Sequence, residues 1–541
     1  MTNDQQYGAH FRCFWFLGTF GVTLLFFVLH LAVGKQHAFG PSWLVADLGW
    51  YLNQLSKLMD GGLLYRDVAT PYGPLPYYWQ VLWASLFGVS PVVFFAASAT
   101  VIAAANGVIA LLFRKHLKKV SASAIILLSA VCLQQYSTGL MLITVPWAML
   151  ETAIVMGLWQ RGPESTLRRN LLIGIVLGLG QLNKFGYFAI LAGSIACADL
   201  IVSHWHQPKQ TALRLFQRWL TIGAGFFIVE GGWIVVLFGV LDYSIALDCA
   251  WPAYQVETYR HAFGEEEALW GAFKHVSLPY LVGRIVPIVI LLLLGGSAYI
   301  FARKRTTDPG AFRFALGGLS YLVALALFFH DIHALVLHLW MLFGFLIYAF
   351  LVGTDRQRFV SVVIAATMSA ALPVRWYRAS VDRTESLRVT ENSTLWVPKE
   401  LAQKYQELVQ LLEEHVPEGN RVLVYDWEGI AVFSGRESVG RHAWPLEGWV
   451  REHEKTRLHE DLNTLDFLVL EKRAGYSEGL LDQSLGSPKE RVETQIPLPD
   501  MYAEFLATKA AEPSQVSEHW IIVPLSGVDE YQGTSIDENG L

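Results

Sequence analysis

Long apolar runs dominate the chain, and they restrict its fold more than any other feature. A helix needs about 20 mainly apolar residues to cross the hydrocarbon core of a bilayer. Runs that approach or reach this length occur at residues 13–33, 91–113, 121–136, 141–159, 170–182, 185–203, 219–240, 280–302, 312–329, 333–352 and 358–374. The sequence therefore predicts a multi-span α-helical membrane protein with about eleven spans.

Charge is sparse and unevenly distributed. Charged residues make up 16% of the 541 residues, whereas soluble domains usually carry about 25%. This composition excludes a soluble enzyme as the main interpretation. Residues 1–380 contain 26 basic and 17 acidic side chains, whereas residues 381–541 contain 15 basic and 30 acidic ones. The asymmetry predicts a membrane domain over residues 1–380 and a soluble domain over residues 381–541.

The soluble part has its own periodicities. Residues 398–415 have the apolar spacing of an amphipathic helix. Short segments at 421–427, 465–472 and 520–525 are rich in β-branched and aromatic residues, which is typical of strands. We therefore expect a small C-terminal α/β domain.

Lys and Arg indicate the orientation of the chain, because they are enriched in cytoplasmic loops. They collect around residues 114–119, 161–169, 209–218, 303–313 and 356–358, in every second loop. The N-terminus is then cytoplasmic, and the first external loop (34–90) and the C-terminal domain are extracytoplasmic. This orientation requires that residues 74–88 lie on the outer surface as an interfacial helix, with 43–59 as a second one.

The first external loop contains two acids among turn-forming residues. Asp47 lies near the start of the expected helix, and Asp67 precedes the rigid segment Pro71-Tyr72-Gly73-Pro74. A carboxylate at a membrane surface is expensive unless it is paired or functional. Two simpler roles stay open, since Asp47 could cap the helix and Asp67 could cap a turn or pair with Arg66.

The order of motifs in 46–88 resembles a known class of enzymes. After the first apolar run come D-x-G-x-Y, G-x-x-x-Y-x-D, P-Y-G-P-L-x-Y and L-F-G. This order is similar to that of polytopic glycosyltransferases of the GT-C class, in particular protein O-mannosyltransferase-like and aminoarabinose-transferase-like enzymes. The resemblance implies a GT-C-like membrane fold and a polyprenyl-phosphate-linked sugar as donor.

The resemblance also implies roles for individual residues. Asp47 would be the general base on the acceptor, with Asp67 as the second catalytic acid of the loop. The residues expected to bind substrate are Lys184 and His333 at the donor phosphate, Tyr72 near the loop acids, and Arg260 and Lys274 in the large external loop. For Lys184, a membrane-surface anchor is the simpler alternative, and for His333 a helix cap or interhelical hydrogen bond.

The metal is left unassigned. Some relatives have an acid directly before a proline in the second external loop, but here Val145 precedes Pro146, and Glu151 lies further along the same run. A divalent cation is compatible with the acids of the first loop, and no other cofactor is indicated.

These observations lead to one functional hypothesis and two rivals. The hypothesis is an inverting glycosyltransferase of the plasma (inner) membrane, acting on a lipid, glycan or protein acceptor, with no nucleic-acid partner. The rivals are a transporter or flippase of lipid-linked sugars and a non-catalytic membrane scaffold. A transporter is expected to show an inverted repeat, which is not apparent, and a scaffold leaves the acids and prolines of 46–88 unexplained.

Overall fold

The computed structural model describes part of the chain, and the following account is confined to that part. The described residues are 15–25, 28, 43–68, 70, 72–113, 144–159, 166–206, 212–240, 316–318, 320–321, 384–390, 393–424, 436–438, 455–471, 515–517 and 519–525. They fall into two compact units. The first comprises Met1–Phe39, Leu64–Arg66 and Thr70–Arg383, and the second comprises Gly40–Leu63, Asp67–Ala69 and Thr384–Leu541.

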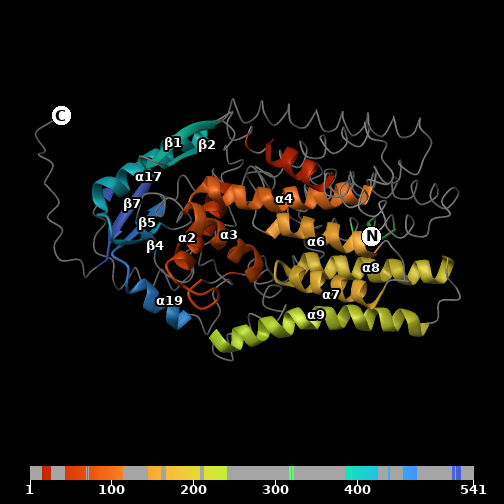
Figure 1. The fold of residues 1–541 in the computed structure, drawn as a ribbon. Coiled ribbons are helices and arrows are strands. Elements are labelled where there is room, and N and C mark those ends of the chain that lie inside the picture. The colour runs from red at the N-terminus through yellow and green to blue at the C-terminus, as the bar shows by residue number, and fades with distance from the viewer. Residues whose placement is uncertain are drawn as a thin grey trace, which may run out of the picture. The chain divides into compact units, whose positions relative to one another are not determined.

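The first unit is a bundle of apolar helices. After a short helix over Trp15–Leu25, its helices are α3 (Pro74–Phe87), α4 (Pro91–Phe113), α6 (Thr144–Trp159), α7 (Leu167–Gln181), α8 (Phe185–His206) and α9 (Ala212–Val240). Helices α4, α6, α7, α8 and α9 run side by side (Figure 1). Among the described residues, Val92–Leu111 and Ala212–Val240 are long and apolar enough to cross a membrane. Several predicted spans lie outside the described residues, so the number of spans stays a prediction.

Glycines bring α7 and α9 into close contact. A Cβ on Gly174 would overlap the carbonyl of Ile222, and one on Gly225 would overlap the carbonyl of Leu171. Gly178 lies one turn further along α7 and faces Val229. Gly174 and Gly178 thus form a small-xxx-small face, which allows α7 and α9 to pack closely.

Helix α3 packs on α4 through polar side chains and leaves an apolar face exposed. The Trp79 indole donates to the Ala97 carbonyl, and the Gln80 amide donates to Phe94 and Ser98. Towards the C-terminal end of the helix, Leu82, Leu86 and Phe87 are exposed. The helix predicted over 74–88 is present as Pro74–Phe87, and its exposed apolar side chains are typical of a helix lying in a membrane interface.

The second unit contains a mixed sheet. The sheet has the order β4-β3-β5-β7-β6, formed by β3 (Arg421–Val424), β4 (Glu437–Ser438), β5 (Phe467–Glu471), β6 (Gln515–Val516) and β7 (Trp520–Pro524). Strand β3 is parallel to β4 and β5, whereas β7 is antiparallel to β5 and β6. The central strands β3, β5 and β7 are buried, and their Val, Leu, Ile, Phe and Trp side chains form the core. The strands predicted near 421, 465 and 520 are therefore present.

Three helices and a hairpin complete this unit. They are α2 (Trp43–Met59), α17 (Lys399–His415), α19 (Lys455–Leu462) and the antiparallel pair β1 (Thr384–Thr390) and β2 (Ser393–Pro398). Helix α17 buries Tyr405, Leu408 and Leu412 at helical spacing, as the amphipathic pattern predicts. The buried Arg436 guanidinium donates to the carbonyls of Leu412 and Val416, so it satisfies the otherwise open C-terminal end of α17.

Helix α2 has the predicted bounds, but in its middle the polar side chains are buried as well as the apolar ones. Leu52 and Leu55 are buried as expected, and so are Asn53 and Gln54. An interfacial helix would leave its polar side in water, whereas residues 49–55 of α2 are buried on all sides.

Candidate functional site

Main-chain hydrogen bonds fasten the Pro-Tyr-Gly-Pro segment to the connection between α7 and α8. The amide of Gly73 donates to the carbonyl of Asn183 at 2.9 Å, and the amide of Leu75 donates to that of Leu182 at 3.1 Å. A Cβ at position 73 would overlap the Leu182 carbonyl. Glycine is thus required here by the close approach of two backbones, and we call this pairing the strap.

The strap brings two of the predicted site residues together. Lys184 follows the strapped segment, and its Nζ lies 5.2 Å from the ring centroid of Tyr72 and 5.5 Å from that of Tyr187. Both distances allow cation–π attraction. The Lys184 residue is only 8% exposed, so its ammonium is held in a largely enclosed position. We call Tyr72, Lys184 and Tyr187 the Lys184 cluster.

Lys184 also stands at the beginning of a helix. Its carbonyl accepts from the amide of Phe188, and α8 starts at the next residue. The N-terminal end of a helix has a partial positive charge and open N–H donors. The lysine ammonium and this helix end together favour an anion at this place.

A buried acid lies beside the strap. Glu151 of α6 is 6% exposed and interacts with the Asn183 side chain. Its Oε1 has no hydrogen-bond partner among the described residues. The Asn183 amide also donates to the Thr144 carbonyl at 2.9 Å, which connects α6 to the strap. The structure therefore places Glu151, the acid that could substitute for the missing one before Pro146, next to the Lys184 cluster.

The two predicted catalytic acids belong to the second unit. Asp47 lies in α2, and its side chain is outside the described part. Asp67 closes a turn, since its Oδ2 accepts from the Leu63 amide at 2.8 Å and its own amide donates to the Leu63 carbonyl. The turn-capping alternative for Asp67 is therefore realised, and a catalytic role stays a prediction.

The other predicted contacts cannot be placed. His333, Arg260 and Lys274 lie outside the described residues. Within the described ranges, no group of three or more His, Cys, Asp and Glu side chains could hold a metal ion. The metal stays unassigned.

An ion pair that the sequence did not predict lies between α8 and α9. Arg218 donates to Asp199 at 3.0 Å, and the Trp159 indole donates to the same carboxylate oxygen. Arg218 and Asp199 are both buried. Arg218 fits the basic-loop pattern by sequence, yet it lies inside α9 because this helix begins at Ala212, before its apolar run.

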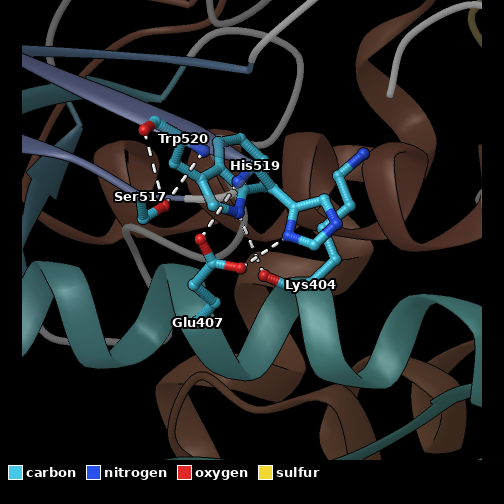
Figure 2. Close-up of polar contacts among 5 residues, drawn as sticks. All are labelled: Lys404, Glu407, Ser517, His519 and Trp520. Atoms are coloured by element: carbon cyan, nitrogen blue, oxygen red, sulfur yellow. Dashed lines mark hydrogen bonds and ion pairs between the residues drawn. The ribbon is translucent and has the colours of Figure 1, made fainter. Parts of the chain in front are cut away.

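The C-terminal domain has a second polar cluster, which joins α17 to β7 (Figure 2). The Oε2 of Glu407 lies 2.6 Å from Nδ1 of His519, and its Oε1 accepts from the His519 amide. Burial raises the pKa of Glu407, but hydrogen bonds from Ser517 and His519 outweigh it and hold this pKa below its usual value. We call Glu407, Ser517 and His519 the Glu407 clasp.

Beneath the clasp, Trp520 anchors β7 to the same helix. Its indole donates to the Lys404 carbonyl at 3.0 Å, and the Lys404 ammonium lies 5.5 Å from its ring centroid. Figure 2 shows Glu407 and Lys404 on one helix facing the turn that carries Ser517 and His519. The clasp and Trp520 together therefore attach the start of β7 to α17.

The apolar helical bundle and the mixed α/β domain are the two parts that the sequence predicts, with the fold of the GT-C class as the expectation. Comparison with solved structures bears this out for the fold. The chain matches ArnT from Cupriavidus metallidurans bound to undecaprenyl phosphate with a TM-score of 0.51 and 13% identity, over 96% of this chain and 99% of that one. The chain thus has the fold of ArnT, and the resemblance is confirmed at the level of fold.

Other matches are weaker. The Archaeoglobus fulgidus oligosaccharyltransferase in its apo form gives a TM-score of 0.42 at 13% identity, over 84% of this chain and 69% of that one. The archaeal oligosaccharyltransferase AglB in complex with an inhibitory peptide and a dolichol-phosphate gives 0.40 at 12% identity, over 85% and 70%. No family model matches the chain, and no curated protein matches it in sequence.

Several residues of the site are not apparent from sequence reasoning. Asn183 and Tyr187 flank Lys184 in the segment QLNKFGY, and only their contacts give them a role. The sequence offers two signals: a polar residue directly before the lysine, and an aromatic residue that follows the lysine by one helical turn. Neither indicates that Tyr72, which is distant in sequence, completes the cluster.

Proposed function

We propose that the protein is a membrane glycosyltransferase that moves a sugar from a polyprenyl-phosphate carrier to an acceptor on the outer face of the plasma (inner) membrane. The observation that carries the proposal is the Lys184 cluster at the start of α8, in a chain with the ArnT fold. The matched ArnT structure holds undecaprenyl phosphate, which supports a carrier of the same chemical class here.

Lys184 is suited to the donor phosphate for electrostatic reasons. Lys184 is a largely buried residue, and a cation attracts an anionic ligand more strongly in low-dielectric surroundings than in water. Tyr72 and Tyr187 restrict where the ammonium can lie. A cation fixed in advance is most effective where charge develops, and in this reaction negative charge develops on the departing lipid phosphate. His333 is the second proposed phosphate contact, with Arg260 and Lys274 as further ones.

The chemistry needs a base as well as a cation. We assign Asp47 as the general base that takes the proton of the acceptor hydroxyl, with Asp67 as the second acid of the same loop. The acceptor oxygen forms the new bond to the anomeric carbon, and the bond from that carbon to the phosphate oxygen breaks. A single displacement of this kind inverts the anomeric configuration.

Two variants test the proposal in complementary ways. Asp47→Asn is expected to lower transfer by about 100-fold or more, since general-base catalysis contributes 10²–10⁴-fold. Lys184→Met is expected to weaken binding of undecaprenyl phosphate by about 10- to 100-fold, the value of a hydrogen bond to a charged group. Transfer is measured by mass spectrometry of membrane lipids and envelope glycans, and binding by native mass spectrometry of the purified protein.

The controls separate the parts of the proposal. Glu414→Gln changes an exposed acid on α17 and is expected to behave like the unaltered protein. Full transfer by Asp47→Asn would remove Asp47 from the mechanism. A protein that moves the lipid-linked sugar across the membrane without transferring it would be a transporter instead.

A further inference from the structure

Tyr65 has a backbone conformation that a tyrosine rarely adopts. Its φ is +70°, in the left-handed region that side chains with a Cβ avoid. Among the described residues, the others with positive φ are the glycines 61, 88 and 419. Strained residues of this kind persist only where their surroundings hold them, and they gather at functional sites.

The contacts of Tyr65 explain what holds it. Its hydroxyl donates to the Tyr72 carbonyl at 2.7 Å, and its ring meets the edge of Trp233 with the centroids 6.2 Å apart. Tyr65 is 4% exposed, so the hydrogen bond is protected from water. The strained Tyr65 thus places its hydroxyl where it holds the backbone carbonyl of Tyr72.

Tyr72 is held from a second side as well. Its amide donates to the Thr70 hydroxyl, which is itself paired with the Tyr77 hydroxyl at 2.8 Å. Directly after Tyr72, the Gly73 amide makes the strap to Asn183. The Tyr72 ring, which contacts Lys184, therefore projects from a backbone whose Tyr72 carbonyl, Tyr72 amide and Gly73 amide are all hydrogen-bonded.

We propose that Tyr65 is a positioning residue, whose hydroxyl fixes Tyr72 and thereby the place of the Lys184 ammonium. The inference rests on the proposed function in one respect only: the position of the Lys184 ammonium matters because the ammonium contacts the phosphate of the donor. The line of contacts runs from Trp233 in α9 through Tyr65 and Tyr72 to Lys184. Tyr65 itself touches no substrate in this scheme.

The test uses Tyr65→Phe, which removes one hydroxyl and keeps the ring against Trp233. Without its hydrogen bond, Tyr72 gains freedom and the enclosure of Lys184 loosens. We expect Lys184 in the purified full-length protein to react three- to tenfold faster with an amine-specific acylating reagent, as followed by peptide mass spectrometry. We also expect undecaprenyl phosphate to bind three- to tenfold more weakly.

Two comparisons make these results specific. Thr221→Val removes a hydroxyl that donates to the Gln217 carbonyl at an exposed position of α9, and it should change neither readout. In a Lys184→Met background, Tyr65→Phe should weaken undecaprenyl phosphate binding no further, because Tyr65 acts through Lys184.

Three results would overturn the inference. They are an unchanged reactivity of Lys184 in Tyr65→Phe, an equal loss of binding with and without Lys184, and a Tyr65→Phe protein that fails to fold, which would assign Tyr65 to global stability. If the unaltered protein does not bind undecaprenyl phosphate, the proposed function fails, whereas the reactivity of Lys184 still decides the role of Tyr65.

Discussion

The neighbours of Lys184 determine the position of its positive charge. The ammonium lies near two tyrosine rings, and the residue directly precedes α8, whose N-terminal end has a partial positive charge. Sequence reasoning selects this lysine from its place between two apolar runs. It could not supply Tyr72 as the partner, because the two residues are far apart in the chain and meet only through the strap.

Asp67 offers a direct distinction between catalysis and turn formation. Asp67→Asn keeps an oxygen that can accept from the Leu63 amide, so the turn and the thermal stability should persist. If the carboxylate is catalytic, loss of its charge lowers transfer by about 100-fold. Melting temperature and transfer are measured on the same preparation.

Asp67→Ala is the companion variant, since it removes both the charge and the hydrogen bond. Normal transfer by Asp67→Asn together with a lower melting temperature of Asp67→Ala would assign Asp67 to the turn alone.

Hydropathy predicts where a helix lies in the chain better than it predicts the residues at which the helix begins and ends. Helix α4 has the predicted bounds, whereas α7 and α9 begin at Leu167 and Ala212, ahead of the predicted 170 and 219. The apolar run marks the part suited to a bilayer, and the hydrogen-bonded helix continues into the charged residues beyond it. The hairpin β1–β2 is missing from the prediction because its strands are short and partly charged, without a continuous apolar face.

The Glu407 clasp predicts how the C-terminal domain responds to acid. The pKa of Glu407 is lowered in the folded protein, so the clasp adds stability above the ordinary carboxyl pKa of about 4.3. This stability is lost as the pH falls through the lowered pKa. We expect faster amide exchange across 515–525 at such pH, after correction for the intrinsic pH dependence of exchange.

The matched pair for this experiment is Glu407→Gln and Glu414→Gln, both on α17. Glu407→Gln should remove the acid-dependent part of the exchange, and the difference between the variants isolates the clasp. An identical acid response in both would show that Glu407 does not couple β7 to α17.

The full chain combines a membrane bundle with an α/β domain, and its fold is the part that sequence reasoning anticipates best. Hydropathy and charge asymmetry are sums over many residues, so a fold predicted from them stays correct even when single residues are misassigned. The candidate site depends on a few atoms within hydrogen-bond distance, and such distances have no signature in a linear pattern. The close approach at Gly73 is the clearest case.

Orientation in the membrane can be tested by labelling. The native cysteines 13, 132, 197 and 249 are replaced by serine, and Glu414→Cys is introduced at an exposed position of α17. A membrane-impermeant maleimide should label it in cells with an intact inner membrane, since the positive-inside rule puts the C-terminal domain outside. Lys115→Cys, in a predicted cytoplasmic loop, should react only after lysis, and the reverse pattern would invert the topology.

The strap joins its two segments through peptide groups alone, apart from the requirement for glycine at position 73. The side chains of Tyr72 and Tyr187 take no part in these hydrogen bonds. Positions 72 and 187 could be varied as a library, because no hydrogen bond of the strap uses their side chains, whereas Asn183 is best kept, since its side chain also holds the Thr144 carbonyl of α6.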